Sequence, residues 1–466
     1  GFKDTDSGAD RNKVSAVLNK LANKLFYSNY KDKNLSGIVR IAEGLTSSSA
    51  TAKAAKEGSI TFSDGTKEGT AAGQGYYDYT PASEVVYKTG PITDSEQISK
   101  TRDDGGTGTV TVKNSSAVSM DGSSYVSTMY AKDAYKSATR DNPMVVDLDG
   151  RNLALDAESH DRIAAAIYVT DNAHMNVKNS SSDKKLSITA SNTARTAANG
   201  ILVKGGYGAL SIQGPVEINN ITTGGNSANG IAVNGSNSEI HVDGPLTIAG
   251  VEGKDIRGMG ISTTGIGVIG DYSKVTVNEN VDITGVKGSS LKTSGADAEI
   301  SVGGGTITAA GDGKKDHNYY AARVDKGTIN INMKDGKAGS NTTKITGDMY
   351  ATGQYGKRVV EYSGGELVDW TNAGKLNVAL TDSGSFWTGV AAYDQYNDDY
   401  GPGGNTMHDI GEVNLYLQNG AAWTNEQQSH VTSTTLAKDK QVGRGSQLAS
   451  LLGGSDSSHA GRISPI

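Results

Sequence analysis

The sequence contains no cysteine, only seven prolines and no long run of apolar residues. Without cysteine the chain has no disulfide, no thiolate zinc site and no cysteine nucleophile, although this absence alone leaves the redox compartment open. No segment approaches the ~18 consecutive apolar residues of a membrane-spanning helix. The first residues also lack the charged, apolar and small-residue order of a secretory signal. We therefore expect a soluble chain and interpret it as a mature fragment of a larger protein.

Charge and hydrophobicity are both modest. The 44 basic and 51 acidic residues leave a formal net charge of −7 and form no basic stripe, so nucleic acid and anionic membranes are not expected as partners. Only 35% of the residues are hydrophobic, and 61 are glycine. Such a chain cannot fill a thick globular core, but it fills a thin one if short apolar strands stack in a column.

The first 108 residues differ from the rest. Apolar residues at helical spacing after Asp10, a candidate N-cap, predict an amphipathic helix over 11–27. Alternating segments at 37–41 and 59–62 predict strands. We expect residues 1–108 to form a small N-terminal α+β elaboration, packed on the following domain or inserted in it, because a helix with one apolar stripe needs a surface to cover.

From Thr109 onward, short apolar strands alternate with turns of Gly, Asn, Asp and Ser. The segment Asn199–Val203 recurs thirty residues later as Asn229–Val233. The next multiples of thirty hold Ile261, Leu291 and Ala321. A repeat of this length indicates a solenoid, since the blades of a β-propeller run longer, at roughly 40 to 45 residues.

A second register runs in phase with the first. Leu210–Ile218 matches Ile240–Ile248 at the same offset, and Val275–Val277 with Val281–Ile283 follows after a five-residue insertion. Several alternating strands per repeat, with insertions in the turns, are typical of a coil of parallel strands. The sequence therefore predicts an all-β fold, a right-handed parallel β-helix over residues 109–425.

Aromatic residues close the last repeats. A strand, a glycine turn and Trp-Thr occur over Leu376–Thr388 and again over Val413–Thr424, and Trp370 begins a third Trp-Thr pair. A large ring after a turn is expected to seal the exposed end of the core. These residues resemble the passenger domains of autotransporters of the pertactin and diffuse-adherence adhesin type. Residues 426–466 look like the C-terminal end of such a passenger, leading toward a missing pre-barrel region.

The resemblance covers most of the chain from Thr109 onward, mainly as a style of repeat. It implies export across the outer membrane to the bacterial cell surface or the extracellular space. It also implies that membrane attachment occurs only through a C-terminal β-barrel, which this sequence does not contain.

Two motifs resemble those of enzymes, but we interpret both as ordinary turns. Gly265–Gly270 satisfies the dinucleotide fingerprint, yet a strand at 275–277 follows where that motif requires a helix. Asp382–Ser385 is similar to the nucleophile region of protease passengers, but it aligns with the turn at 418–421 of the next repeat. The seven histidines are scattered, and His241 should point outward from its strand. We expect no catalytic residue, no metal site and no cofactor.

Clustered acids are the main enzymatic alternative, because glycan-cleaving β-helical enzymes use acids on one sheet face. We interpret the acidic segment near the C-terminus as a solvated loop, with a calcium site or a catalytic acid pair as open alternatives. Its acids are Asp394, Asp398, Asp399 and Asp409.

Tyrosine is unusually frequent, with 21 Tyr against 4 Phe. Tyr combines rigid area with a hydroxyl group and so suits recognition surfaces, although it can equally cap the corners of coils. The candidate binding residues are Tyr76, Tyr77, Tyr79, Tyr319, Tyr320, Tyr393, Tyr396 and Tyr400.

We therefore expect a surface adhesin without catalysis, whose partner is a host glycan, a host surface protein or a like passenger on a neighbouring cell. Two alternatives stay open. A β-helical glycan-active lyase or hydrolase would place acids close together in a groove, and a self-assembling extracellular filament subunit would leave its terminal coils uncapped.

Overall fold

A computed structural model describes residues 59–62, 84–87, 91–101, 109–120, 123–132, 142–254, 262–311, 319–352, 358–362, 365–367, 374–392, 394–398, 405–409, 411–425, 433–437 and 440–443. Most strands pair in parallel with the strand three places along the chain, so each coil supplies one strand to each of three sheets. The predicted parallel β-helix is confirmed. The chain divides into two compact units, Glu68–Arg323 and Val324–Ile466 with Gly1–Lys67.

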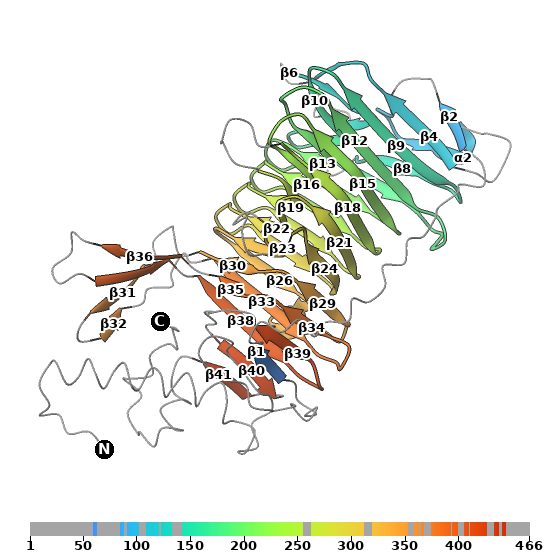
Figure 1. Cartoon of the computed structure of the whole chain (residues 1–466). Helices are drawn as coiled ribbons and strands as arrows, with labels where there is room; N and C mark the ends of the chain where they lie inside the picture. Colours follow the sequence, from blue (N-terminus) through green and yellow to red (C-terminus); the bar gives the residue numbers. More distant parts are fainter. Residues whose placement is uncertain are drawn as a thin grey trace, which may run out of the picture. The chain divides into compact units, whose positions relative to one another are not determined.

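Three sheets, named A, B and C, build the unit Glu68–Arg323 (Figure 1). Sheet A contains, in spatial order, β24 (Gly305–Ala309), β21 (Val281–Val286), β18 (Leu246–Glu252), β15 (Val216–Thr223), β12 (Leu186–Asn192), β9 (Asn152–Ser159), β4 (Thr109–Asn114) and β2 (Glu84–Tyr87). Sheet B contains β22 (Ser289–Thr293), β19 (Thr264–Val268), β16 (Ala228–Val233), β13 (Ala198–Val203), β10 (Ile163–Val169), β6 (Ser123–Val126) and β5 (Val118–Met120), with β7 (Met129–Ala131) also paired to β10. Sheet C contains β23 (Glu299–Val302), β20 (Lys274–Val277), β17 (Glu239–Val242), β14 (Ala209–Ile212), β11 (His174–Lys178), β8 (Met144–Asp147) and β3 (Glu96–Gln97), which α2 (Ile98–Thr101) follows.

The second unit repeats the arrangement. Its strands of sheet A are β29 (Thr343–Thr346), β34 (Phe386–Thr388), β39 (Ala422–Asn425) and β1 (Ser59–Phe62), and those of sheet B are β30 (Met349–Ala351) and β35 (Ala391–Ala392). Its strands of sheet C are β26 (Thr328–Ile331), β33 (Lys375–Leu380), β38 (Glu412–Leu417), β40 (Ser433–Ala437) and β41 (Lys440–Gly443). Two antiparallel additions are β27 (Met333–Lys334) with β28 (Lys337–Ala338), and β32 (Gly365–Leu367), β31 (Arg358–Tyr362), β37 (Asn405–Asp409) and β36 (Asp394–Asp398). The short strand β25 (Ala322–Val324) lies at the division between the units.

The core of the unit Glu68–Arg323 consists of columns of identical or similar side chains. In sheet B one column is fully buried and continues through five coils, as Ile167, Ile201, Ile231, Ile266 and Leu291. Alternation along each strand sends these side chains inward, where each rests on the side chains of the coils before and after it. Burying one such side chain contributes roughly 1.5 to 3 kcal/mol.

The register of one coil differs from the predicted one. Ile231 pairs with Ile266, whereas the thirty-residue spacing predicted Ile261, which lies outside the described residues. The five-residue insertion therefore precedes β19, and the following coil, from Ile266 to Leu291, is shorter by the same amount. These two opposite changes return Leu291 to a multiple of thirty, so the sequence spacing concealed them.

The N-terminal predictions have mixed outcomes. The strand at 59–62 is confirmed as β1, whereas the helix over 11–27 and the strand at 37–41 lie outside the described residues. Strands β2 and β3 already belong to sheets A and C, so pairing with the solenoid sheets begins before Thr109. The boundaries predicted at 108 and 425 stay predictions.

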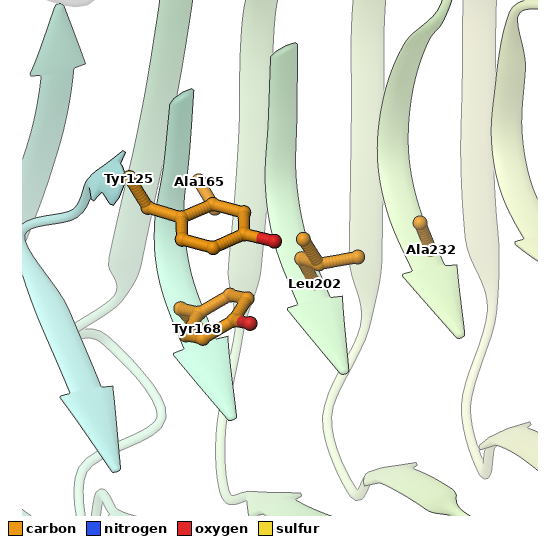
Figure 2. Packing of buried hydrophobic residues seen from close by; sticks show 5 residues of the cluster. All are labelled: Tyr125, Ala165, Tyr168, Leu202 and Ala232. Atoms are coloured by element: carbon orange, nitrogen blue, oxygen red, sulfur yellow. The ribbon is translucent and has the colours of Figure 1, made fainter. Parts of the chain in front are cut away.

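Sheet B also has a small apolar cluster on its outward face. Tyr168 alternates with the inward residues Ile167 and Val169 and is only 1% exposed. Figure 2 shows Tyr125 beside Tyr168, with Leu202 and Ala232 on the strands that follow. The two tyrosine rings stack with centroids 4.6 Å apart, and Lys204 donates a hydrogen bond of 2.6 Å from Nζ to the Tyr125 hydroxyl. This cluster fastens β6 to the coils beside it.

In the second unit, two of the Trp-Thr pairs form one stack inside the core. The rings of Trp387 on β34 and Trp423 on β39 are stacked, with centroids 4.5 Å apart and planes within 3° of parallel. Each indole donates to a backbone carbonyl, of Gly347 and Gly389 respectively, at 3.0 Å. Both rings are buried, so they fill the core across neighbouring coils; Trp370 lies outside the described residues.

We predict that Trp387→Ala destabilises the second unit by about 3 to 5 kcal/mol, because the substitution leaves a cavity against Trp423 and an unsatisfied carbonyl. Urea unfolding followed by far-ultraviolet circular dichroism measures this change. Phe386→Ala is the matched control, since the neighbouring ring points outward and is 36% exposed. Equal losses for the two variants would contradict a buried indole stack.

Candidate functional site

Of the tyrosines predicted to bind a partner, the structure describes the side chains of two. Tyr319 and Tyr320 are half-buried, and the Arg323 guanidinium lies 5.8 Å from the centre of the Tyr320 ring. The backbone carbonyl of Tyr320 accepts a 2.8 Å hydrogen bond from Ser290, which holds this segment against sheet B. Tyr319 and Tyr320 therefore contribute to the packing of the coil and do not form a freely exposed binding surface. Five others lie outside the described residues, namely Tyr76, Tyr77, Tyr79, Tyr393 and Tyr400, and Tyr396 is described only as part of strand β36.

The glycines of Gly265–Gly270 do not form the predicted turn. Gly265 and Gly267 lie within strand β19, and only the last residues of the motif turn toward β20. An added Cβ at Gly265 would meet the Ser290 carbonyl oxygen at 2.5 Å, so the glycine allows two coils to approach each other. The next element is a strand, as predicted, and a helix N-terminus for a pyrophosphate is therefore missing from this motif.

The Asp382–Ser385 motif is a turn between β33 and β34, as predicted. The Asp382 carboxylate accepts hydrogen bonds from the hydroxyls of Thr342 and Ser385 and from the Gly384 backbone N–H. Burial alone would raise the pKa of Asp382, but these hydrogen bonds outweigh it and lower the pKa below its usual value. The Ser385 hydroxyl is buried and also accepts from the Thr343 backbone N–H, so the motif stabilises a turn.

The acidic segment near the C-terminus contains two antiparallel strands, β36 and β37, where a loop was predicted. In their register Asp394 is opposite Asp409, and Asp398 is opposite Asn405. Asp399 lies outside the described residues. Within the described part of the chain, no group of three or more His, Asp or Glu residues is arranged to hold a metal ion.

Acids also occur on the outward face of sheet A. Glu217 and Asp282 occupy one column with Thr247 between them, two strand spacings or about 10 Å apart. Burial raises the pKa of the Asp282 carboxyl, whereas Glu217 forms a 2.6 Å ion pair with Lys185.

His241 points outward from sheet C, as predicted. Its Nε2 lies 2.7 Å from an Asp243 carboxylate oxygen, and Asn278 donates to the same oxygen at 2.8 Å. The His241 and Asp243 side chains remain 41% and 44% exposed. This polar cluster joins two coils, and it lies on an open face of sheet C.

A different set of residues stands out on the turns that connect sheet B to sheet C. One position in each of five successive coils has a left-handed backbone, with φ between 50° and 60°. We call these residues the B–C turn row: Asn172, Tyr207, Asn237, Tyr272 and Asp297. The row follows the β-helix axis and belongs entirely to the unit Glu68–Arg323.

Backbone hydrogen bonds between coils hold this row in place. The backbone N–H of each of the first four row residues donates to a carbonyl of the next coil, at 2.8 or 2.9 Å. The bonds join Asn172 to Gly206, Tyr207 to Ser236, Asn237 to Asp271 and Tyr272 to Ala296. The row is therefore part of the same axial ladder that joins the strands, and its spacing is that of the sheet.

Glycine makes this close approach possible two residues before the row. An added Cβ at Gly235 would lie 1.2 Å from the Gly205 carbonyl oxygen, and one at Gly270 would lie 2.0 Å from that of Gly235. Serine hydroxyls after the row complete the packing, because Ser238 donates to the Gly205 carbonyl at 3.1 Å and Ser273 donates to that of Gly235. The turns consequently stack with no room for adjustment.

The two tyrosines of the row are exceptional in both conformation and exposure. Asn and Asp tolerate a left-handed backbone, whereas a bulky side chain there is a genuine outlier. Tyr207 and Tyr272 nevertheless have φ of 60° and 57°, and they are 62% and 58% exposed. Ile269, in the same coil as Tyr272, is 57% exposed. A strained backbone that presents exposed rings, without burying them, points to a recognition surface.

The sequence-based search missed these two tyrosines because it looked for tyrosines clustered along the chain. A signal was nevertheless present: each lies four residues after an inward valine, Val203 or Val268, and follows a glycine-containing turn. Aligning the coils on those valines places both tyrosines in one column.

Comparisons with known proteins assign the chain to no family. No protein-family model, no curated protein and no solved structure matches the chain. Among the helices within the described ranges, none is long and apolar enough to cross a membrane. The assignment of a function therefore depends on the surface of the solenoid.

We predict that Tyr207→Asn and Tyr272→Asn each leave stability unchanged or raise it by about 0.5 to 1 kcal/mol, because asparagine adopts the left-handed conformation at a lower cost. Thermal unfolding measures the effect. Asn237→Tyr, at the intervening position of the row, is the matched control and should lower the unfolding midpoint. If the two Tyr→Asn variants unfold more easily than the wild type, the rings have a structural role.

We also predict that the Asp382 turn weakens in acid. A carboxylate whose folded-state pKa is lowered contributes stability above the ordinary Asp pKa of ~3.9, and that contribution is lost as the pH falls through the lower folded-state value. Asp382→Asn should therefore be less stable than the wild type at neutral pH, with a difference that shrinks below about pH 4. Ser383→Ala in the same turn is the control, and urea unfolding from pH 7 to pH 2 is the measurement. A difference independent of pH would contradict this interpretation.

Proposed function

We propose that this chain is a bacterial surface passenger that acts as an adhesin and has no catalytic activity. The observation that carries the proposal is the B–C turn row, which exposes two aromatic rings on a backbone that is bonded to the next coil. Exposed aromatic side chains at a fixed spacing suit binding, because little conformational freedom is lost when a partner docks.

The coils support this role in a second way. Their outward faces carry ladders of polar side chains, as where Asn377 donates to Asn330 and Asn414 donates to Asn377, at 2.8 and 2.9 Å. Such faces are hydrated and regular, and they tolerate variation in the turns between them. A partner would contact several coils at once through weak polar contacts. The resemblance to autotransporter passengers agrees with a location on the cell surface or outside the cell, where the partner is a host glycan, a host protein or a like passenger.

Beads coated with the purified chain test the proposal. We expect coated beads to adhere to cultured epithelial cells or to each other, while albumin-coated beads do not, and we expect no fragments to be released from pectin or host glycans. Adhesion to no surface would overturn the adhesin proposal. Release of oligosaccharides would instead favour a glycan-active enzyme, and concentration-dependent polymers of the free chain would favour a filament subunit.

A further inference from the structure

The B–C turn row has the geometry of a site for a linear sugar chain. We propose that it binds a neutral, 1→4-linked polysaccharide that lies along the β-helix axis, with the rings of Tyr207 and Tyr272 stacked on two of its sugars. This inference deepens the proposed adhesive function and rests on it.

The spacing of the rings is the first argument. Tyr207 and Tyr272 occupy the same position of the turn two coils apart, which corresponds to about 10 Å along the axis. In an extended β-1→4 chain, alternate sugars present the same face, and each sugar advances by about one strand spacing. The two rings therefore match the first and third sugars of such a chain, while the middle sugar lies over the coil of Asn237.

The polar groups between the rings are the second argument. Asn237 and the neighbouring residues Ser236 and Asn234 are all exposed on the intervening coil. Amide and hydroxyl groups donate and accept hydrogen bonds, as sugar hydroxyls do. A sugar face supplies C–H groups for an aromatic ring and hydroxyls at its rim, and it therefore fits a surface of rings separated by amides better than a continuous apolar partner does.

Charge selects among polysaccharides. Three carboxylates, of Asp171, Asp271 and Asp297, are exposed along the same turns. Of the nearby cations, Lys204 points its Nζ toward the Tyr125 hydroxyl, and Lys274 lies 3.8 Å from the Glu299 carboxylate. An anionic, uronate-containing chain would meet these three carboxylates and is disfavoured.

Preorganisation is the third argument. The backbone at Tyr207 and Tyr272 is bonded to the next coil, and the glycines beside the row leave no space for movement. The backbone under both rings is therefore fixed before binding. Less conformational entropy is lost when the partner binds, so the affinity is reduced less. The same two residues combine the left-handed backbone with exposed side chains, so the cost in stability coincides with exposure.

Binding of cello- and chito-oligosaccharides of two, three and six sugars tests the proposal by calorimetry. We expect the trisaccharide to bind about tenfold more tightly than the disaccharide, because only the trisaccharide reaches both rings. Tyr272→Asn should abolish that advantage of length, and the double variant Tyr207→Asn with Tyr272→Asn should lose about tenfold in affinity per ring. Tyr207→Trp should retain binding, since it keeps a stacking face.

Several outcomes would overturn the inference. These are binding of neither oligosaccharide family to the wild-type chain, equal binding of di- and trisaccharides, unchanged affinity in the double variant, or stronger binding of a hyaluronan hexasaccharide.

The bead assay separates failure of the polysaccharide site from failure of the proposed adhesive function. If beads coated with the double variant adhere like the wild type, the adhesin proposal stands and the Tyr207–Tyr272 site is wrong. If the oligosaccharides bind but wild-type beads adhere to nothing, the site stands and the adhesin proposal fails.

Discussion

Each coil of this β-helix depends on the coils beside it for both its backbone hydrogen bonds and its core contacts. Ile201 is buried because Ile167 and Ile231 cover it, and in an isolated coil its side chain would be exposed. The same dependence applies to the turns, where the Gly205 carbonyl oxygen packs so close to Gly235 that no side chain fits there. Strands, core residues and turns therefore repeat along the axis at the spacing between neighbouring strands. Side chains at the same turn position of successive coils are separated by that spacing.

This dependence explains how much the sequence could predict. Alternating apolar residues define strands locally, so the strand positions and the parallel β-helix followed from short segments such as Leu210–Ile212. The register between distant coils did not. Ile261 and Ile266 both follow a glycine, and only pairing with Ile231 distinguishes them. The candidate site required that register, because Tyr207 and Tyr272 fall in one column, two coils apart, only after the inserted residues are placed correctly.

At two positions of the B–C turn row, the residue type is unfavourable for stability. Three of its members, Asn172, Asn237 and Asp297, are residue types that accept a left-handed backbone, which indicates what the fold alone favours at this position. Tyr207 and Tyr272 violate that preference while remaining exposed, so no buried contact offsets the strain. Local rules tend to be broken at functional sites, and here the violation recurs two coils apart.

Recurrence matters because each ring alone would bind weakly. A stacked ring is worth about 0.5 to 1.5 kcal/mol, too little for specific attachment by itself. Two rings held at a fixed distance act together, since binding of the first sugar brings the second ring within reach of the same chain at a high effective concentration. A flexible loop would lose most of this advantage to the entropy of ordering. The axial hydrogen bonds under Tyr207 and Tyr272 avoid that loss, and for this reason the rigidity of the solenoid and its capacity for recognition have the same physical origin.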